Sequence, residues 1–385
     1  MVEDGGRQVL QVSAGGDDSE EPRGVGNALL GGALRVGAAL GVPVVAFTLL
    51  WVTFKFLQDS DANRGLIVLV AVVVGVVGVW ALYWGMDIVI NQLPARWQER
   101  IRPFAFVGPA VVILLVYLVY PAINTIIISF FDGTSDEFVG LENYGFVFTD
   151  DAMLRSIRNT LGWIIIVPAV AVSTGLVFAT LVDRLRRGEA LAKSLIFLPM
   201  AVSFVGAAIV WRFIYSFRPE GFGTQIGLLN GLKVGLNQAP TAWLSNDPWN
   251  NLFLMVIMVW LQTGFAMVIL SAAIKSVPES IIEAARIDGA SEIQIFWKVI
   301  IPTIMSSIVV VTTTMVITVM KVFDIVWVMT SGESGTEVVA ERMIRWFFRN
   351  GHFGRGAAIA VVLFLAIIPI MLLNVRRFRA EEALR

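Results

Sequence analysis

Long apolar runs separated by short polar segments dominate the pattern of this 385-residue chain. A helix needs about 20 apolar residues to cross a bilayer, and eight runs come close to that length. They occupy residues 34–57, 65–90, 104–131, 160–182, 191–217, 252–275, 304–329 and 355–376. Lipid offers no hydrogen-bond partner to an open backbone, so each run is predicted to be a helix. The pattern therefore predicts an all-α, polytopic membrane protein with about eight transmembrane helices.

The composition independently indicates a membrane protein. Apolar residues make up 57% of the chain and charged residues only 15%, whereas soluble domains carry about 25% charged residues. The mean hydropathy is +0.76. A net charge of −1 argues against binding nucleic acid through phosphate neutralisation. The chain has no cysteine and a single histidine, which excludes disulfides, zinc–thiolate sites and cysteine nucleophiles. We expect that histidine, His352, to be a solvated residue of an outer loop.

The polar segments suggest four parts along the chain. Residues 1–33 are glycine-rich and acidic, which predicts a flexible cytoplasmic tail and does not fit a signal peptide. Residues 34–102 hold two accessory transmembrane helices and a basic loop, with Asp87 as the one polar residue of note. Residues 103–379 form a six-helix core with the distinctive features, and 380–385 form a cytoplasmic C-terminal end.

Lysine and arginine in the short loops predict the orientation. Three basic segments fall on one side: Arg96, Arg100 and Arg102; Arg184, Arg186, Arg187 and Lys193; and Arg376, Arg377, Arg379 and Arg385. The other side receives the acidic loop that contains Asp132, Asp136, Glu137, Asp150 and Asp151, and the polar stretch 218–250. Arg342, Arg345 and Arg349 depart from this division. The pattern places both termini in the cytoplasm.

One polar stretch, residues 276–302, lies between two apolar runs and predicts a two-helix hairpin. Ser276-Val277-Pro278-Glu279 has the form of a capping box, and Gly289 can supply the left-handed end of the first helix. Ser291-Glu292-Ile293-Gln294 is a second capping box, and its helix is expected to end before Pro302. In that helix Ile293, Phe296 and Trp297 form an apolar stripe.

The spacing within this hairpin is specific. Glu283-Ala284-Ala285 is followed by Asp288-Gly289-Ala290, with Gly289 six residues after Glu283 and Pro302 thirteen residues after Gly289. This arrangement resembles the EAA loop of ABC importer permeases, which implies that these seven residues form a cytoplasmic coupling hairpin seated in an ATPase cleft. The alternative is an ordinary loop between spans. No lysine follows a glycine, so the chain lacks a phosphate-binding loop of its own.

Other segments are similar to the maltose-type sugar permeases of that family. They are Pro103 to Phe131, the Gly140-Leu141-Glu142-Asn143-Tyr144 loop, Arg158-Asn159-Thr160, Phe197-Leu198-Pro199, Trp211-Arg212, Phe323-Asp324, Thr330-Ser331-Gly332 and the 374–379 tail. The resemblance implies a subunit in the bacterial inner membrane that imports an alpha-glucoside or maltodextrin, or else another sugar or glycerol-phosphate. It implies as partners a second permease, two ATPase subunits and an extracytoplasmic sugar-binding protein. No cofactor is expected in this chain; ATP and magnesium belong to the ATPase.

Polar and aromatic residues within the spans are candidates for the solute passage. Lys321 and Asp324 are three residues apart and are expected to share a helix face, either as a solute site or gate or as an internal ion pair. Gln262 and Thr263 are further candidates. Trp211 and Tyr215 could stack on a sugar ring or anchor a helix at the membrane interface.

Two rival classes remain open at this point. A stand-alone secondary transporter would show inverted repeats around a midplane site and would leave the hairpin unexplained. A membrane enzyme would need a cluster of catalytic carboxylates or histidines near one interface, and the sequence offers none.

Overall fold

The computed structural model describes residues 41, 44–45, 47–59, 62–185, 187–219 and 221–382. The chain divides into two compact units, Met1–Val119 and Tyr120–Arg385, and each is described by itself. The predicted flexible tail 1–33 lies outside the described residues, as do residues 383–385 of the predicted C-terminal end.

The all-α, polytopic prediction is confirmed. Five described helices are long and apolar enough to cross a membrane, and two bent helix pairs bring the number to seven. The predicted span 34–57 is described only in part, with residues 47–59 helical. The only β feature of the described residues is an isolated bridge between Phe131 and Phe138.

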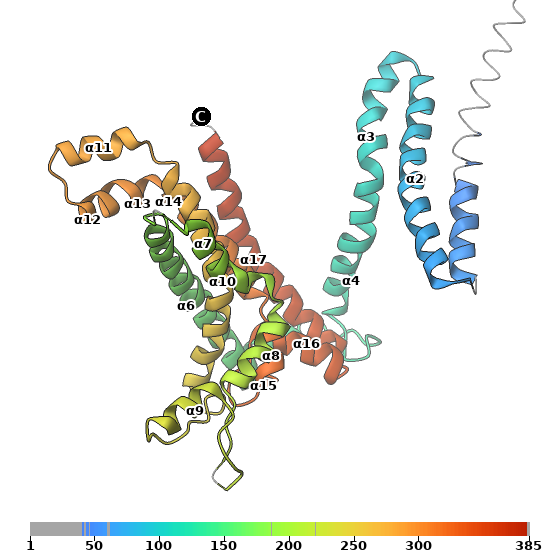
Figure 1. Cartoon of the computed structure of the whole chain (residues 1–385). Coiled ribbons are helices and arrows are strands. Elements are labelled where there is room, and N and C mark those ends of the chain that lie inside the picture. The colour runs from blue at the N-terminus through green and yellow to red at the C-terminus, as the bar shows by residue number, and fades with distance from the viewer. Residues whose placement is uncertain are drawn as a thin grey trace, which may run out of the picture. The chain divides into compact units, whose positions relative to one another are not determined.

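Unit 1 contains the helical residues 47–59, α2 (Arg64–Asn91) and α3 (Ala95–Leu114), followed by a π-helical turn at Leu115–Val119 (Figure 1). The tight turn from α2 to α3 is closed by polar side chains. The Arg102 guanidinium donates to Asn91 Oδ1 at 2.8 Å and lies 3.3 Å from Asp87 Oδ1. Asp87 is therefore part of the turn that joins the two helices.

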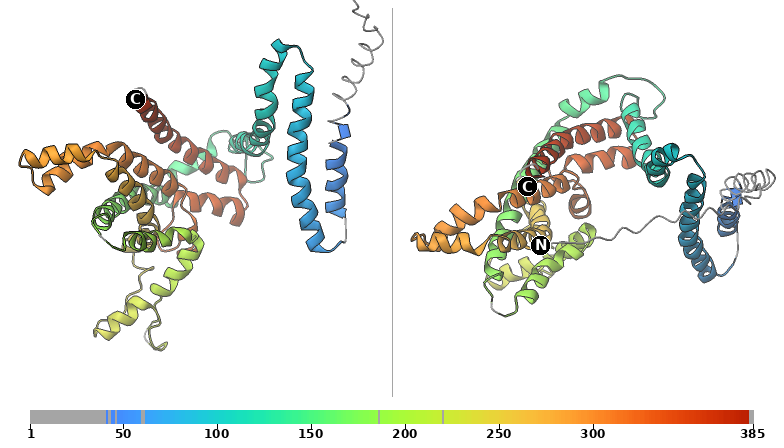
Figure 2. Two further views of the ribbon diagram at one scale, coloured as in Figure 1. Left: turned by 45° about the horizontal axis from the view of Figure 1, so that its top comes forward. Right: turned by 90° about the horizontal axis from the view of Figure 1, so that it is seen from above.

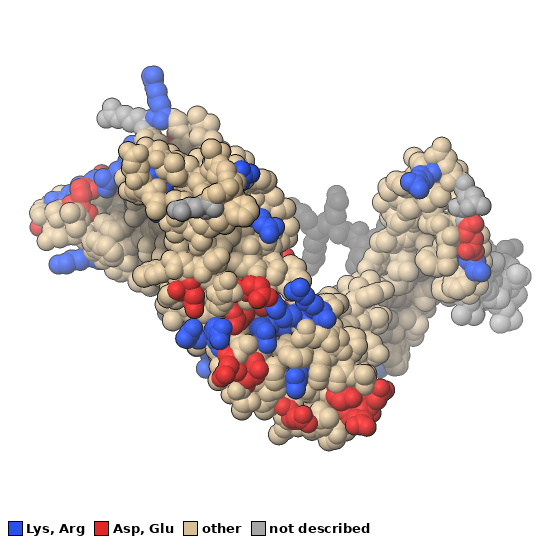
Figure 3. Space-filling view, turned by 90° about the horizontal axis from the view of Figure 1, so that it is seen from below, with Lys and Arg blue, Asp and Glu red and all other residues tan. Residues whose placement is uncertain are grey.

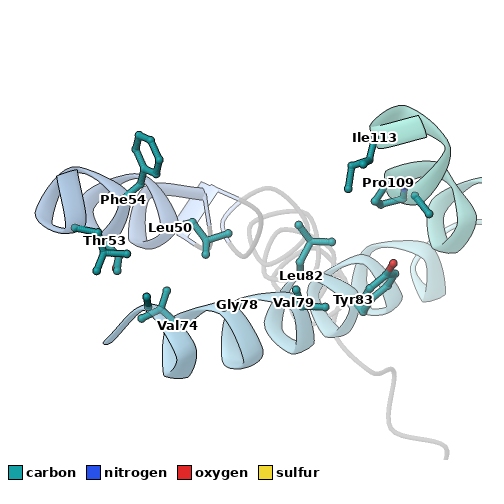
Figure 4. Close-up of a pocket in the computed structure, with 14 residues that line it drawn as sticks. Leu50, Thr53, Phe54, Val74, Gly78, Val79, Leu82, Tyr83, Pro109 and Ile113 are labelled. Carbon is teal, nitrogen blue, oxygen red and sulfur yellow. The ribbon is translucent and has the colours of Figure 1, made fainter. Parts of the chain in front are cut away.

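A groove of about 680 Å³ lies within unit 1, between residues 50–57, α2 and α3 (Figure 4). Two of its lining residues are polar, and the hydroxyl group of each donates a hydrogen bond to a backbone carbonyl of unit 1. The Thr53 hydroxyl donates to the Leu49 carbonyl at 2.8 Å and the Tyr83 hydroxyl to the Phe106 carbonyl at 3.3 Å. The groove thus presents an apolar wall to its contents, which does not suit a hydrophilic solute.

Unit 2 is a helical bundle (Figures 1 and 2). Its helices are α4 (Tyr120–Ile128), α5 (Glu142–Thr149), α6 (Asp151–Val182), α7 (Glu189–Phe197), α8 (Phe204–Ile214), α9 (Leu228–Gly235), α10 (Trp249–Lys275), α11 (Glu279–Ile287), α12 (Glu292–Ile295), α13 (Ile301–Thr303), α14 (Met305–Met320), α15 (Asp324–Thr330), α16 (Val339–Ile344) and α17 (Phe353–Glu382).

The centre of unit 2 is the pairing of α6 with α10. Trp163 of α6 is fully buried, and its indole N–H donates to Asn251 Oδ1 of α10 at 3.4 Å. Farther along α6, a Cβ at Gly175 would lie 2.5 Å from Ala266 Cβ, so only glycine permits this close approach. The α6–α10 pair therefore forms the rigid centre on which the other helices pack.

Two predicted spans are interrupted, contrary to the prediction of continuous helices. In 191–217, α7 and a 3₁₀ turn at Leu198–Ala201 meet α8 at a bend of 99°. Pro199 stands at the start of the 3₁₀ turn, and Ser203 caps α8 by accepting the Gly206 N–H at 3.0 Å. In 304–329, α14 stops at Met320 and α15 begins at Asp324.

Candidate functional site

The hairpin predicted from residues 276–302 is present at one end of unit 2, and α11 and α12 reach away from the bundle in every view (Figures 1 and 2). We call this end the hairpin end. The first capping box predicted there is wrong, because Pro278 is the N-cap residue of α11 and provides no side-chain bond. Ser276 instead completes α10, its hydroxyl donating to the Ala273 carbonyl at 2.7 Å.

The predicted end of α11 is confirmed. Gly289 has φ = 81°, and its N–H donates to the Arg286 carbonyl at 3.0 Å. The Ala290 N–H donates to the Ala285 carbonyl at 3.0 Å. These two bonds form a Schellman motif, in which the left-handed residue is normally glycine. The Ala-Ala-x-x-Asp-Gly-Ala spacing therefore describes one helix end and its reversal.

The second capping box is also confirmed. Ser291 Oγ accepts the Gln294 N–H at 3.4 Å, and Gln294 Oε1 accepts the Ser291 N–H at 2.8 Å. The expected helix end before Pro302 is wrong, because helical structure continues to Thr303. A π-helical turn at Phe296–Ile300 precedes the proline. Such a widened turn tolerates a residue that has no N–H to donate.

The root of the hairpin is buried in the bundle. Val277, Ile301 and Ile304 are buried together, with Ile282 and Phe296 packed against them. The same cluster includes side chains of α6, α10 and α14. The hairpin is therefore attached to the bundle through an apolar cluster, so that a force on its tip is transmitted to several helices.

The tip of the hairpin, in contrast, is exposed. Ile287 is 86% exposed, Ile293 73% and Trp297 61%. The Glu283 carboxylate lies among them, is exposed and has no hydrogen bond or ion pair within 4 Å among the described residues. The Arg286 guanidinium bridges the two helices by pairing with Glu292 at 3.0 Å, and this bond raises the pKa of Arg286. We call the exposed side chains of the tip, chiefly those of Glu283, Ile287, Ile293 and Trp297, the docking surface.

The remaining residues of the EAA-like pattern lie on or next to this surface. Ala284, Asp288, Gly289 and Pro302 are exposed, whereas Ala285 and Ala290 are half-buried. Exposed apolar side chains beside an unpaired carboxylate are typical of a surface that another protein covers. The arrangement is suited to protein docking, and it holds no group placed for covalent chemistry.

The expected shared face of Lys321 and Asp324 is wrong. Lys321 is exposed and follows the last turn of α14, while Asp324 begins α15 after the break at Val322 and Phe323. They form no ion pair with each other. Their part in a passage remains a prediction.

The other passage candidates lie in packed surroundings. Gln262 and Thr263 of α10 are 9% and 7% exposed. Tyr215 is 3% exposed, and its hydroxyl donates to the Phe253 carbonyl at 3.0 Å. The Trp211 ring lies 5.2 Å from the Tyr215 ring. Tyr215 and Trp211 are thus part of a packed cluster, and their part in the passage stays a prediction.

A polar stripe on α14 was missed at the sequence level. Thr314 is exposed, Thr318 follows one turn later, and Lys321 completes the same face at the spacing i, i+4, i+7. The face of α14 next to this stripe is buried through Val311 and Met315. The signal in the sequence was the run of threonines at helical spacing, which the high apolar content of the span obscured.

The end of unit 2 opposite the hairpin is held by side-chain amides. Asn159 donates to the carbonyls of Gly335 and Glu337 at 2.8 and 2.9 Å. Asn250, fully buried, donates to the Ser334 carbonyl at 2.7 Å. The Asn-Thr motif near residue 160 therefore fixes the loop that follows α15.

Charged side chains at this opposite end are largely paired. Arg345 pairs with the fully buried Glu341 at 2.8 Å, and Arg342 lies 3.7 Å from Asp150. Burial raises the pKa of the Glu341 carboxyl, while Arg345 opposes that rise. Figure 3 shows acidic and basic side chains intermingled on the face seen from below. Two of the three arginines that departed from the orientation pattern thus take part in ion pairs.

His352 lies in the loop before α17, as the sequence predicts, but it is half-buried and not fully solvated. Its ring lies 5.7 Å from the Trp346 ring, and its Nδ1 accepts the N–H of Arg355 in the first turn of α17 at 3.2 Å. Burial, and next the charge of Arg355, lower the pKa of this imidazole.

A helical membrane bundle with an exposed hairpin fixed at its root is the architecture of a transport permease. The chain belongs to the family described as the binding-protein-dependent transport system inner membrane component, which matches residues 171–378, just over half of its length. It is therefore the permease subunit of an ABC importer and is not itself an enzyme.

Two relatives extend the match beyond that segment. The chain is 55% identical over 280 residues to the osmoprotective compounds uptake permease GgtC of Synechocystis sp., covering 73% of this chain and 100% of that protein. It is 45% identical over 328 residues to the alpha-glucoside transport system permease AglF of Rhizobium meliloti, covering 82% of this chain and 97% of that protein.

A solved structure shows the same fold. A bacterial ABC transporter that imports the acidic polysaccharide alginate contains a chain that matches with a TM-score of 0.65. The match has 18% sequence identity and covers 74% of this chain and 99% of that one. The resemblance to importer permeases is thus confirmed from the family match and the fold together.

Proposed function

We propose that this permease moves a small, hydroxyl-rich glycoside, first of all an alpha-glucoside, into the cytoplasm, and that hairpin α11–α12 couples it to ATP hydrolysed on another chain. The observation that carries the coupling role is the docking surface: an unpaired Glu283 among exposed apolar side chains, on a hairpin whose root is buried. ATP and magnesium would be held by the partner ATPase.

Two substitutions test the coupling role. A desolvated, hydrogen-bonded charge pair loses about 2–5 kcal/mol when one partner is truncated, so Glu283→Ala should weaken ATPase binding strongly. Gly289→Leu should strain the left-handed turn by about 1 kcal/mol or more and add bulk to the docking surface. We expect both variants to insert in the membrane at normal levels, and to lose ATPase copurification or to hydrolyse ATP without solute uptake.

The matched control is Asp136→Ala, which removes an exposed carboxylate at the opposite end. It should leave copurification and uptake unchanged, since exposed substitutions usually stay within about 0.5 kcal/mol. Normal copurification together with normal uptake in both hairpin variants would refute the coupling role.

The solute class rests on the relatives. AglF is named for alpha-glucosides and GgtC for osmoprotective compounds, and the chain is similar to both along most of their lengths. We therefore take an osmoprotective solute as the second candidate. Uptake of labelled maltose and trehalose by proteoliposomes that hold the complete importer distinguishes the two. Saturable uptake of either sugar supports the first candidate, whereas solute-dependent growth rescue at high osmolality without sugar uptake supports the second.

For the passage, we propose that the α14 stripe of Thr314, Thr318 and Lys321 faces the solute. Polar side chains accessible at membrane depth normally face water or the interior of an assembly. Thr318→Val and Lys321→Met are each expected to lower uptake several-fold while the complex still assembles. Asp324→Leu tests the predicted role of Asp324 in the same way. Unchanged uptake in all three variants would exclude the stripe and the α15 carboxylate from the passage.

We further propose the partners and placement that the coupling role requires. They are a second permease, two ATPase subunits and an extracytoplasmic binding protein, with the hairpin end and both termini in the cytoplasm. The solved alginate importer was also crystallised with its periplasmic protein. Residues 34–102 are proposed as accessory, since the unit 1 groove is apolar. A chain that begins at Ala95 should retain uptake, and its loss at normal membrane levels would refute that division.

A further inference from the structure

A cluster of four charged side chains joins three helices at the hairpin end, beside the docking surface. Asp183 caps the C-terminus of α6, Glu189 and Lys193 lie in the first two turns of α7, and Lys275 is the last residue of α10. The two carboxylates balance the two ammonium groups. Ser271 of α10 completes the cluster and is 2% exposed. The docking surface uses none of these residues.

Asp183 is the centre of the cluster. Its Oδ1 lies 2.7 Å from Lys193 Nζ and 3.6 Å from Lys275 Nζ, and it accepts the Ser271 hydroxyl at 2.8 Å. The carboxylate is only 11% exposed, and its Oδ2 is buried without a hydrogen-bond partner. A carboxylate so enclosed depends on its neighbours for compensation of its charge.

The lysines connect α7 to the other two helices. Lys193 Nζ lies 2.7 Å from Glu189 Oε1 within α7 and donates to Ser271 Oγ of α10 at 2.6 Å. Lys275 also pairs with Glu189 across the α7–α10 contact. Each lysine therefore contacts two carboxylates, and α7 is tied to both α6 and α10.

Close packing also holds α7 to α10 farther along α7, beyond the charged cluster. A Cβ at Gly264 of α10 would lie 2.5 Å from the Ile196 carbonyl oxygen of α7. Ala192 and Ile196 of α7 pack against buried residues of α6 and α10. The α7 half of the broken span is thus fixed to α10 by charges at its start and by direct backbone contact near its end.

The other half of the broken span packs on a different part of the bundle. Ala207 and Ala208 of α8 are fully buried in a cluster that contains residues of α6, the first half of α10 and α15. The bend of 99° separates α8 from α7. Lys275, at the other end of α10, is followed within three residues by Pro278, the N-cap of α11. The α7 half is therefore attached to α10 next to the root of the hairpin, whereas the α8 half packs on the first half of α10 and on α15.

We propose that the Asp183–Glu189–Lys193–Lys275 cluster makes α7 move with the hairpin as one body, and that the bend at Val202–Ser203 takes up the movement relative to α8. The inference rests on the coupling role proposed for the hairpin. Lys193 is a positioning residue in this scheme: it touches neither solute nor ATPase, and it acts by holding α7 to α10.

The first experiment compares Lys193→Met, Lys193→Arg and the control Lys233→Met in the complete importer in proteoliposomes. Lys233 also makes a side-chain hydrogen bond, to Thr241, but lies on α9. In Lys193→Met we expect ATPase copurification to persist and solute moved per ATP hydrolysed to fall about fivefold or more. Lys193→Arg should restore much of the loss, and Lys233→Met should behave as wild type.

The second experiment measures distances directly, because the chain has no cysteine of its own. Spin labels at Leu191→Cys and Ala272→Cys report on α7 against α10, and labels at Leu191→Cys and Val210→Cys report across the bend. On adding a non-hydrolysable ATP analogue, the first distance should stay constant and the second should change. In Lys193→Met the first distribution should broaden and the second should no longer respond.

The outcomes separate this inference from the coupling role. If the wild-type chain does not bind the ATPase, the proposed coupling role fails. If docking is normal but the bend distance in wild type does not respond to the nucleotide, or Lys193→Met leaves solute per ATP and both distances unchanged, only this inference is overturned. Should Lys193→Met not assemble, Lys275→Met serves as the second variant, since that side chain is 50% exposed and its removal breaks two ion pairs.

Discussion

The two ends of unit 2 differ in how far their polar groups are satisfied within the chain. At the hairpin end, Glu283 is unpaired and Ile287 and Trp297 are exposed. At the opposite end, Asn250 is fully buried and donates its amide to a loop carbonyl, and Glu341 is fully buried beside Arg345. The hairpin end presents apolar groups beside a carboxylate that has no close partner, whereas the side-chain amides of the opposite end bond to their own loop. The same bundle therefore offers a surface for contact at one end and holds its own loop at the other.

The largest effect we expect is a loss of stability when the hydrogen bonds of the opposite end are removed. Asn250→Leu keeps the branched arrangement of side-chain heavy atoms but strands the Ser334 carbonyl and the Asn251 N–H, which Asn250 now satisfies. Each stranded group costs about 1–3 kcal/mol, so stability should fall by about 3 kcal/mol. The melting temperature of the detergent-solubilised chain measures this loss, and Gln238→Leu at an exposed position is the control. Equal melting temperatures for the two variants would mean that the network does not hold the loop.

At the hairpin end we expect a smaller effect, which concerns the affinity for the ATPase and not the stability of the chain. Burial of one isoleucine side chain in an interface contributes about 1.5–3 kcal/mol, so Ile287→Asp should weaken ATPase affinity by up to that amount. The melting temperature of the isolated chain should not change, because Ile287 contacts solvent. Leu141→Asp, at an apolar site of the opposite end that is 69% exposed, should change neither quantity. A fall in the melting temperature of Ile287→Asp would show that the hairpin is part of the core.

The smallest effect we expect is a pH dependence of local stability around His352, at the opposite end of unit 2. Burial lowers the pKa of His352 below its usual value of about 6.5, so folding favours the neutral ring. The resulting stability is present above pH of about 6.5 and is lost as the pH falls through the lowered pKa, where protonation also removes the acceptor for the Arg355 N–H. Amide exchange at residues 352–356 should therefore quicken on acidification. In His352→Phe this pH dependence should disappear, while exchange in the hairpin stays unaffected in both proteins.

Local chemistry predicted the hairpin well but misplaced its boundaries. The Schellman end at Gly289 and the capping box at Ser291 depend on residues within one turn, so the sequence contains the whole signal. Ser276 was misassigned because it directly follows Lys275, the last residue of α10, and serves as the C-cap of that helix and not as the N-cap of the next. Pro302 was read as a stop because a widened turn cannot be recognised from composition.

The breaks in the two spans were missed for a different reason. Hydropathy averages over about 20 residues and carries no information on direction, so a bent helix and a straight one give the same profile. Pro199 and Ser203 were local signals for the bend in the first span. The second break, at Val322 and Phe323, has no proline or glycine to mark it. The position of this break depends on tertiary contacts such as the packing of α15 on α8. These contacts join residues that are more than 100 positions apart in the sequence.

The bend between α7 and α8 also restricts what can surround this chain in a membrane. At about 1.5 Å per residue, the 11 residues of α8 rise about 16 Å, roughly half of the hydrocarbon core of about 30 Å. If α8 stands along the membrane normal and ends at the surface, the bend lies near the middle of the bilayer, where the carbonyls that end one helix lack amide partners. Hydrocarbon cannot compensate such groups, and each would cost several kcal/mol there. We expect lipid to be kept away from Val202 and Ser203, which turns this flank of the chain away from the bilayer.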